Sequence, residues 1–310
     1  MKSGKIAENI LKRSVTNLIG KGPVAGKDCA VTKTEDGYVL TAEALGSFES
    51  ELSVKCAVYR AANNIWAGGG RLLGINAVFM LDRHMEERDL KRLTRTVIAA
   101  CTDCGTILLG GHTEGIPDIE HSYVAVTAIG STKEPCQVKG AKPGDDIVIS
   151  KWAALEKTAL VVNDENSRQS LLTRFSEGYI EPVMDFSGWL TVREEAEIAY
   201  NAGVRCMHDL SLDGIYGALW DVSEGCGHGF AVELDRIPFK QETVEIANFF
   251  EYNAYMAESA GSLMMVTPDG EKLVGTLNDA GIPAVIIGRI SDDNDKKILN
   301  EDEIRYLGRK

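Results

Sequence analysis

Segments with a strand-like residue pattern and segments with a helix-like pattern alternate along the whole chain. Short runs of β-branched and other apolar residues are typical of strands, and apolar residues that recur every three or four positions are typical of helices. We expect strands near 29–32, 38–41, 76–81, 106–109, 123–129, 146–150, 230–233, 262–266 and 284–290. We expect helices near 5–20, 49–66, 86–104, 152–162, 214–225, 241–251 and 270–280, with a polar helical stretch up to about 200. This alternation predicts a mixed α/β or α+β fold.

The clearest break in the alternation lies between residues 135 and 144. This segment is rich in Lys, Pro and Gly and has no periodicity, which is typical of a domain boundary. A chain of 310 residues is long enough for two domains of ordinary size. We therefore predict an N-terminal domain over residues 1–138 and a C-terminal domain over residues 139–310.

Composition excludes several classes of function. A net charge of −13 argues against a nucleic-acid partner, since phosphate backbones are bound by clustered Lys and Arg. No apolar run approaches the roughly 20 residues of a membrane helix, and the first residues lack the apolar core of a signal peptide. The seven cysteines are widely spread, which favours free thiols and a cytoplasmic location. The tight pair Cys101 and Cys104 has no second pair to complete a zinc site, so we interpret it as helix core.

The stretch from Leu108 to Glu114 carries the strongest chemical signal. A predicted strand over 106–109 ends at Gly110 and Gly111, and His112, Thr113 and Glu114 follow at once. Paired glycines allow a sharp turn and a close approach to a ligand, and polar side chains at the end of such a strand often bind one. The simpler interpretation is a loop histidine without a catalytic role.

Four further segments occur with it in a fixed order, namely 26–30 (GKDCA), 63–65 (NNI), 142–148 (KPGDDIV) and 207–209 (MHD). Together these motifs resemble the superfamily of aminoimidazole ribonucleotide (AIR) synthase, which includes thiamine-monophosphate kinase, selenophosphate synthetase and a hydrogenase maturation protein. The chain is most similar to the AIR synthase-related branch. The resemblance implies an N-terminal α/β domain with a mixed sheet and a C-terminal α/β sandwich domain. It also implies a homodimer in which the N-terminal sheets join, with ATP clefts beside the interface.

The resemblance further implies ATP held through Mg²⁺, a cation that prefers oxygen ligands. By this resemblance the metal ligands are Asp28, Glu43, Asn64 and Glu114. The nucleotide contacts are Asp28, Lys27, Asn64, Gly110, Gly111 and Thr113, and the catalytic residues are His112 and Asp209. Three positions depart from the family pattern, since Lys27 replaces an acid, Glu43 replaces a shorter Asp and Asn64 replaces a charged Asp. These departures predict a partly degenerate metal site.

None of the four named activities fits fully. Residues 15–27 contain no Cys, the chain ends without the cysteine tail of the hydrogenase protein, and Lys27 interrupts the double aspartate of the thiamine kinase. The first hypothesis is an ATP- and Mg²⁺-dependent enzyme that phosphorylates or activates an amide-like or phosphate oxygen of a small metabolite. The alternative is a catalytically inactive nucleotide-binding or structural paralogue that acts as a dimer subunit.

Other motifs have non-catalytic interpretations. Asp28 is also compatible with a turn, and His208 with Asp209 could cap a helix. The four tryptophans fit core positions in helices, and residues 68–70 (GGG) lack the spacing of a dinucleotide fingerprint. The acidic run at 292–297 lacks the ligand spacing of a calcium loop and predicts a solvated turn.

Overall fold

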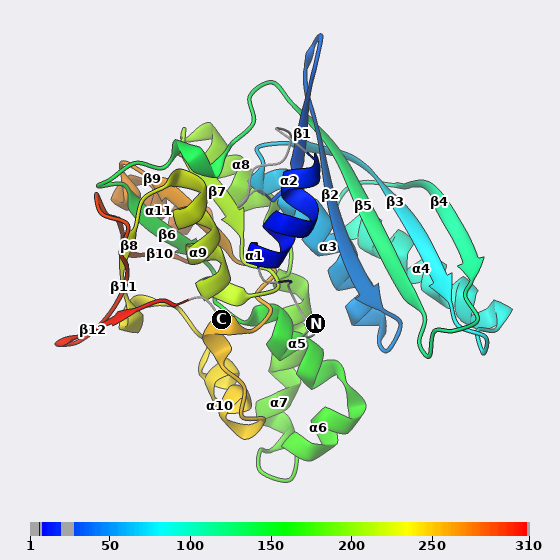
Figure 1. Ribbon diagram of the computed structural model, residues 1–310. Coiled ribbons are helices and arrows are strands. Elements are labelled where there is room, and N and C mark those ends of the chain that lie inside the picture. The colour runs from blue at the N-terminus through cyan, green and yellow to red at the C-terminus, as the bar shows by residue number, and fades with distance from the viewer. Residues whose placement is uncertain (1–5, 7, 20–27, 309–310) are drawn as a thin grey trace.

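The computed structural model describes residues 6, 8–19 and 28–308 (Figure 1). Its first half builds a five-stranded sheet in the order β1-β2-β5-β3-β4. Neighbouring strands are antiparallel except for the parallel pair of β3 and β4, so the sheet is mixed. The elements are β1 (Ala30–Thr34), β2 (Gly37–Ser47), α3 (Glu51–Ala67), β3 (Arg71–Leu81), α4 (Glu87–Asp103), β4 (Leu108–Gly115) and β5 (Tyr123–Thr132).

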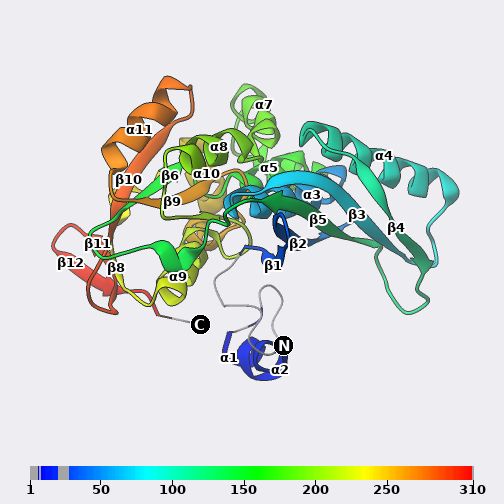
Figure 2. The same ribbon diagram turned by 90° about the horizontal axis from the view of Figure 1, so that it is seen from above.

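Helices α3 and α4 lie along one face of this sheet (Figure 2). Helix α3 begins at Ser50, whose side chain accepts a hydrogen bond from the Ser53 amide and satisfies one of the free N–H groups of the first turn. Every second residue of β5, from Val124 to Ala128, is buried against the helices. This alternation leaves the intervening residues on the opposite face of the sheet.

The opposite face, called the open face below, carries rows of residues that pair across the strands. One row joins Leu45, Ala125, Val78 and His112, and a second joins Glu43, Thr127, Asn76 and Gly110. Leu45 is 55% exposed and Val78 is 37% exposed. An apolar sheet face that remains exposed is typical of a surface that another chain covers.

The second half builds a seven-stranded mixed sheet in the order β12-β11-β8-β10-β6-β9-β7. Its strands are β6 (Asp146–Ser150), β7 (Cys206–Asp209), β8 (Phe230–Glu233), β9 (Leu263–Thr267), β10 (Ala284–Ile290), β11 (Lys296–Asn300) and β12 (Glu303–Tyr306). The helices of eight or more residues are α5 (Leu155–Asn163), α7 (Glu177–Met184), α8 (Arg193–Asn201), α9 (Gly214–Cys226), α10 (Gln241–Phe249) and α11 (Gly270–Asp279). The sequence therefore predicted the fold class correctly, with two α/β domains and mixed sheets.

Helices α5, α6 (Glu165–Leu171), α7 and α10 gather below the two sheets in Figure 1. They enclose a small apolar cluster of their own, made by Val162, Leu171, Ile180, Val183 and Ile246. The main core, in contrast, runs without a break from the N-terminal sheet and α3 to Met207, Leu263 and Met265 of the second half. Because the two halves share this core, α3 and β7 meet at a buried seam.

Several predicted elements differ from the structure. Strand β4 continues through Gly110 and Gly111 to Gly115, so the expected sharp turn after 106–109 is wrong. Residues 8–19 are helical, as expected, but the middle of this segment is π-helical. The run at 292–297 is only partly a turn, because Lys296 begins the hairpin of β11 and β12.

Candidate functional site

A cluster of buried polar side chains occupies the seam between the two halves. Asp28 precedes β1, Asn63 lies on α3, and His208 and Asp209 end β7. The Asp209 amide donates a hydrogen bond of 3.0 Å to Oδ2 of Asp28. A chain segment 181 residues away thus holds the Asp28 carboxylate at the end of β7, where polar groups meet between the sheets.

His208 lies between two carboxylates. Its Nδ1 contacts Oδ1 of Asp28, and its Nε2 lies 3.5 Å from Oδ2 of Asp221 on α9. Burial alone would lower the pKa of His208, but Asp28 and Asp221 outweigh burial and raise this pKa to about 10. His208 therefore carries a positive charge at neutral pH and balances the negative charge of the cluster.

Asp209 is the least satisfied member of the cluster. Its Oδ1 accepts a hydrogen bond of 3.3 Å from Asn63, but its buried Oδ2 has no hydrogen-bond partner among the described residues. Burial, followed by the charges of Asp28 and Glu156, raises the pKa of Asp209 well above its ordinary value. An unpaired buried carboxyl oxygen of this kind is suited to a proton, a cation or a substrate hydrogen-bond donor.

Asn63 joins the two halves through its side-chain amide. Nδ2 donates to the Leu190 carbonyl at 3.0 Å as well as to Asp209, and Oδ1 accepts from the Val192 amide at 3.1 Å. Its neighbour Asn64, which the family resemblance implied as a ligand, is half-buried, and Asn63 itself was not predicted. The sequence did indicate that Asn63 is buried, because this polar residue falls on the apolar side of α3 among Ala62 and Ile65.

Glu156 on α5 is a second buried carboxylate that the sequence analysis missed. Its Oε1 lies 3.7 Å from Nε of Arg60, and its Oε2 accepts from the Ala260 amide at 3.3 Å. Burial raises the pKa of Glu156, although Arg60 opposes this shift. The feature that could have indicated Glu156 is a charged residue at a buried position of a helix, which is rare without a partner.

Most of the other predicted site residues lie on strands β2 and β4, whereas Asn64 lies on helix α3. His112 and Glu114 are both 65% exposed, with 3.5 Å between Nε2 and Oε2. Glu43 on β2 is separated from β4 by two intervening strands, or roughly 14 Å at ordinary strand spacing. Figures 1 and 2 both place β4 at the outer edge of the molecule, away from the C-terminal sheet. Within one chain, the Glu43 and Glu114 carboxylates therefore lie too far apart to share one ion.

Strand β4 also holds Gly110, Gly111 and Thr113, all exposed. A Cβ on Gly111 would lie 1.7 Å from the Ala77 carbonyl oxygen, whereas a Cβ on Gly110 would contact nothing within 4 Å. Gly111 is thus required by the close approach of β3. Lys27 lies outside the described residues.

Three further interpretations can be compared with the structure. His208 and Asp209 lie on β7, so the alternative that they cap a helix is wrong. Cys101 and Cys104 are buried in the core, as expected. Trp66 is buried, but Trp189 is 40% exposed, so the tryptophans do not all fill core positions.

Two features are absent from the described parts of the chain. In residues 6, 8–19 and 28–308, no group of three or more His, Cys, Asp and Glu side chains is arranged to hold a metal ion. Within the same ranges, no helix has both the length and the apolar character that a membrane span requires.

Family models match both halves of the chain. The N-terminal domain of AIR synthase related protein matches residues 26–132, and the C-terminal domain of the same family matches residues 142–299. The chain belongs to the AIR synthase related protein family. The two matches leave residues 133–141 between them. The division at residues 138 and 139 stays a prediction.

Similar proteins come from several branches of this superfamily. Carbamoyl dehydratase HypE of Rhizobium leguminosarum bv. viciae is 24% identical over 270 residues, which are 84% of this chain and 74% of HypE. A chain in the crystal structure of a HypE-HypF complex has a TM-score of 0.78 at 18% identity, covering 97% of this chain and 99% of that one. AaThiL complexed with AMPPCP and TMP has a TM-score of 0.76 at 15% identity, and the match covers 98% of this chain and 99% of the AaThiL chain. The two structural matches show that the fold is shared over nearly the full length.

Proposed function

We propose that the protein is an ATP- and Mg²⁺-dependent enzyme that phosphorylates or activates an amide-like or phosphate oxygen of a small metabolite. The observation that carries this proposal is the buried Oδ2 of Asp209, which has no hydrogen-bond partner in residues 6, 8–19 and 28–308, beside the anchored carboxylate of Asp28. The similarity to HypE, which is named a carbamoyl dehydratase, and to AaThiL, which binds AMPPCP, supports ATP as the co-substrate.

The donor atoms of Asp28 and Asp209 fit Mg²⁺, because this ion is usually held by one or two carboxylates and completed by phosphate oxygens and waters. When bound, the ion would neutralise charge on the phosphates of ATP. The protein groups have separate roles in this proposal. Asp28 and Asp209 orient the reactants, Asp209 exchanges a proton with the acceptor oxygen, and the His208 cation limits repulsion between the two carboxylates.

We further propose a homodimer that buries the open face. The exposed apolar row from Leu45 to Val78 supports this arrangement, since a contiguous apolar sheet face favours a partner. In such a dimer, Glu43, His112 and Glu114 face the partner subunit. Nucleotide contacts from Gly110, Gly111 and Thr113, like those from Lys27 and Asn64, stay predictions from the family resemblance.

Calorimetric titration of the protein with AMPPCP, with and without Mg²⁺, tests the proposal. We expect Mg²⁺-dependent binding that Asp28→Asn weakens by about 1–3 kcal/mol, because a charged partner of the metal is lost. His121→Ala is the matched control, since His121 is exposed in the loop before β5 and should leave affinity unchanged. Equal affinities for the two variants would refute the role of Asp28.

A second variant separates the enzyme from the inactive paralogue. Asn64→Asp adds a carboxylate without changing side-chain length, so a working Mg²⁺ site should bind AMPPCP more tightly with Mg²⁺ and not without it. In a cleft without a metal role, the added charge only repels neighbouring acids and lowers the melting temperature. The second outcome, together with absent ATP turnover, would establish the inactive paralogue.

A further inference from the structure

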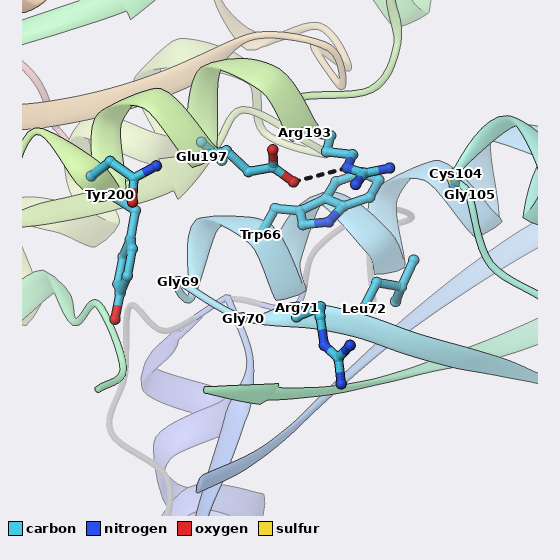
Figure 3. Close-up of a pocket in the computed structure, with 12 residues that line it drawn as sticks. Trp66, Gly69, Gly70, Arg71, Leu72, Cys104, Gly105, Arg193, Glu197 and Tyr200 are labelled. Carbon is cyan, nitrogen blue, oxygen red and sulfur yellow. Dashed lines mark hydrogen bonds and ion pairs between the residues drawn. The ribbon is translucent and has the colours of Figure 1, made fainter. Parts of the chain in front are cut away.

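A cavity of about 470 Å³ lies on the domain seam, on a side that the candidate site does not use (Figure 3). Its floor comes from the end of α3 and the start of β3, one wall from the turn after α4, and the other wall from α8. The residues that define its chemistry are Trp66, Leu72, Gly105, Arg193, Glu197 and Tyr200. The volume falls within the range of cavities that hold small molecules.

Glycines leave the floor and one wall of this seam cavity without side chains. Gly69 has a φ of +72°, and a Cβ there would lie 2.6 Å from the Tyr200 ring. Gly105 has a φ of +66°, and a Cβ there would lie 2.9 Å from Nη1 of Arg193. The positive φ angle favours glycine at both positions, and at Gly69 the fixed Tyr200 ring also leaves no space for a side chain. The glycine run at 68–70 lacks the spacing of a dinucleotide-binding motif, and in the structure it shapes this cavity.

Aromatic and aliphatic groups line the interior. Trp66 and Leu72 lie together beneath α8, and the Tyr200 ring extends down toward the turn at Gly69 (Figure 3). The Tyr200 hydroxyl donates to the Glu134 carbonyl at 2.8 Å, which fixes the ring in place. Flat, rigid surfaces of this kind favour a planar ring as ligand.

Arg193 presents a cation to the cavity, together with its own counter-ion Glu197. Nε of Arg193 lies 2.9 Å from Oε1 of Glu197 one turn along α8, and the two side chains are 52% and 57% exposed. An exposed pair of this kind is weak, so an anionic ligand can compete with Glu197 for the guanidinium. The Arg71 side chain, in contrast, extends away from α8 in Figure 3.

The cavity is also lined by Cys104, whose thiol is not reactive. Burial, followed by the charges of Cys101 and Asp103, raises the pKa of the Cys104 thiol to about 12. A protonated, buried thiol is a poor nucleophile, so the geometry favours reversible binding over covalent chemistry.

We propose that the seam cavity is a second binding site, separate from the cleft of Asp28 and Asp209, for a small organic anion that carries a planar ring. The ring lies between Trp66, Leu72 and Tyr200, and a phosphate or carboxylate group accepts hydrogen bonds from Arg193. The site touches both domains, since Trp66 follows Asn63 by one turn of α3 and Arg193 follows Val192, whose amide is bound to Asn63. This inference does not depend on the proposed enzymatic activity.

Calorimetric titration of the full chain with phenyl phosphate tests this proposal, with benzoate and inorganic phosphate titrated in parallel. We expect saturable binding of one ring-bearing anion per chain and at least tenfold weaker binding of inorganic phosphate, which lacks the ring. Whichever of phenyl phosphate and benzoate binds more tightly identifies the anionic group. Arg193→Gln should weaken binding about tenfold through loss of a charge-assisted contact, whereas Glu197→Gln should strengthen it about threefold by releasing Arg193.

Arg88→Gln is the matched control, since Arg88 also pairs with neighbouring acids on an exposed surface, near the start of α4. It should leave binding unchanged, and melting curves of the variants verify their folding. Three results would overturn the proposal: no saturable binding to the wild-type chain at millimolar concentration, equal affinity of the wild type and Arg193→Gln, or competitive displacement of phenyl phosphate by AMPPCP with Mg²⁺.

Discussion

Asn63 and Asn64 are adjacent in sequence but differ in what each side chain can do. Asn63 is fully buried, with hydrogen bonds to Leu190, Val192 and Asp209. Asn63→Ala should lower the free energy of unfolding by about 1–3 kcal/mol, because it leaves a buried amide and a buried carboxyl without partners. Asn64→Ala, at a half-buried position, should stay within about 0.5 kcal/mol of the wild type. Urea denaturation of both variants checks this prediction, and equal losses would contradict the bridging role of Asn63.

His208 makes the stability of the fold depend on pH. Its folded pKa of about 10 lies above the ordinary value of 6.5, so the folded state binds the extra proton between these two values. The contribution of His208 is therefore fully present below pH 6.5 and is lost as the pH rises toward 10. Asp221→Asn removes one supporting carboxylate and should move this loss to lower pH. Urea midpoints measured from pH 6 to 10 test the shift, and superimposable profiles for the two proteins would argue against it.

At the scale of elements, the close pairing of strand β4 with β3 requires glycine at position 111 but not at position 110. Gly110 and Gly111 have similar φ angles, +159° and +151°, so the same substitution in either meets similar backbone strain. Only Gly111→Ala also forces a Cβ against the Ala77 carbonyl of β3. We expect Gly111→Ala to cost about 1–3 kcal/mol more than Gly110→Ala, as for other overpacked positions. Denaturation and amide exchange of β4 measure the difference, and equal stability of the two variants would show that β4 does not approach β3 so closely.

At the scale of the whole molecule, the open face should determine the oligomeric state. Light scattering should give the mass of two chains rather than the 33.7 kDa of one. Val78→Lys places a charge in the middle of the apolar row and should yield a folded monomer. Ile98→Lys is its control, because Ile98 is a similarly exposed apolar residue on α4 and not on the open face. A wild-type monomer, or dissociation by both variants, would contradict this interface.

Local patterns in the sequence predicted most elements. The bounds of β6, β8 and β10 agree with their predicted ranges, since alternating or continuous apolar residues specify a strand within a few positions. Five ordered motifs were sufficient for the family, and Asp28 and Asp209 were selected from them. The full length of β2 and the passage of β4 through Gly110 and Gly111 were missed, because in each case the neighbouring strand, and not the residues themselves, extends the pairing.

The sequence by itself therefore determined the fold class, the family and two carboxylates of the candidate site, because each depends on residue types at short spacings. Only the tertiary structure decided which groups meet. It joins Asp28 to Asp209 across 181 positions and Asn63 to Leu190 across 127 positions, and it places His112 and Glu114 on β4, at the far edge of the N-terminal sheet. The physical reason is that burial and contact across the seam arise from the packing of α3 against β7, which no local periodicity encodes.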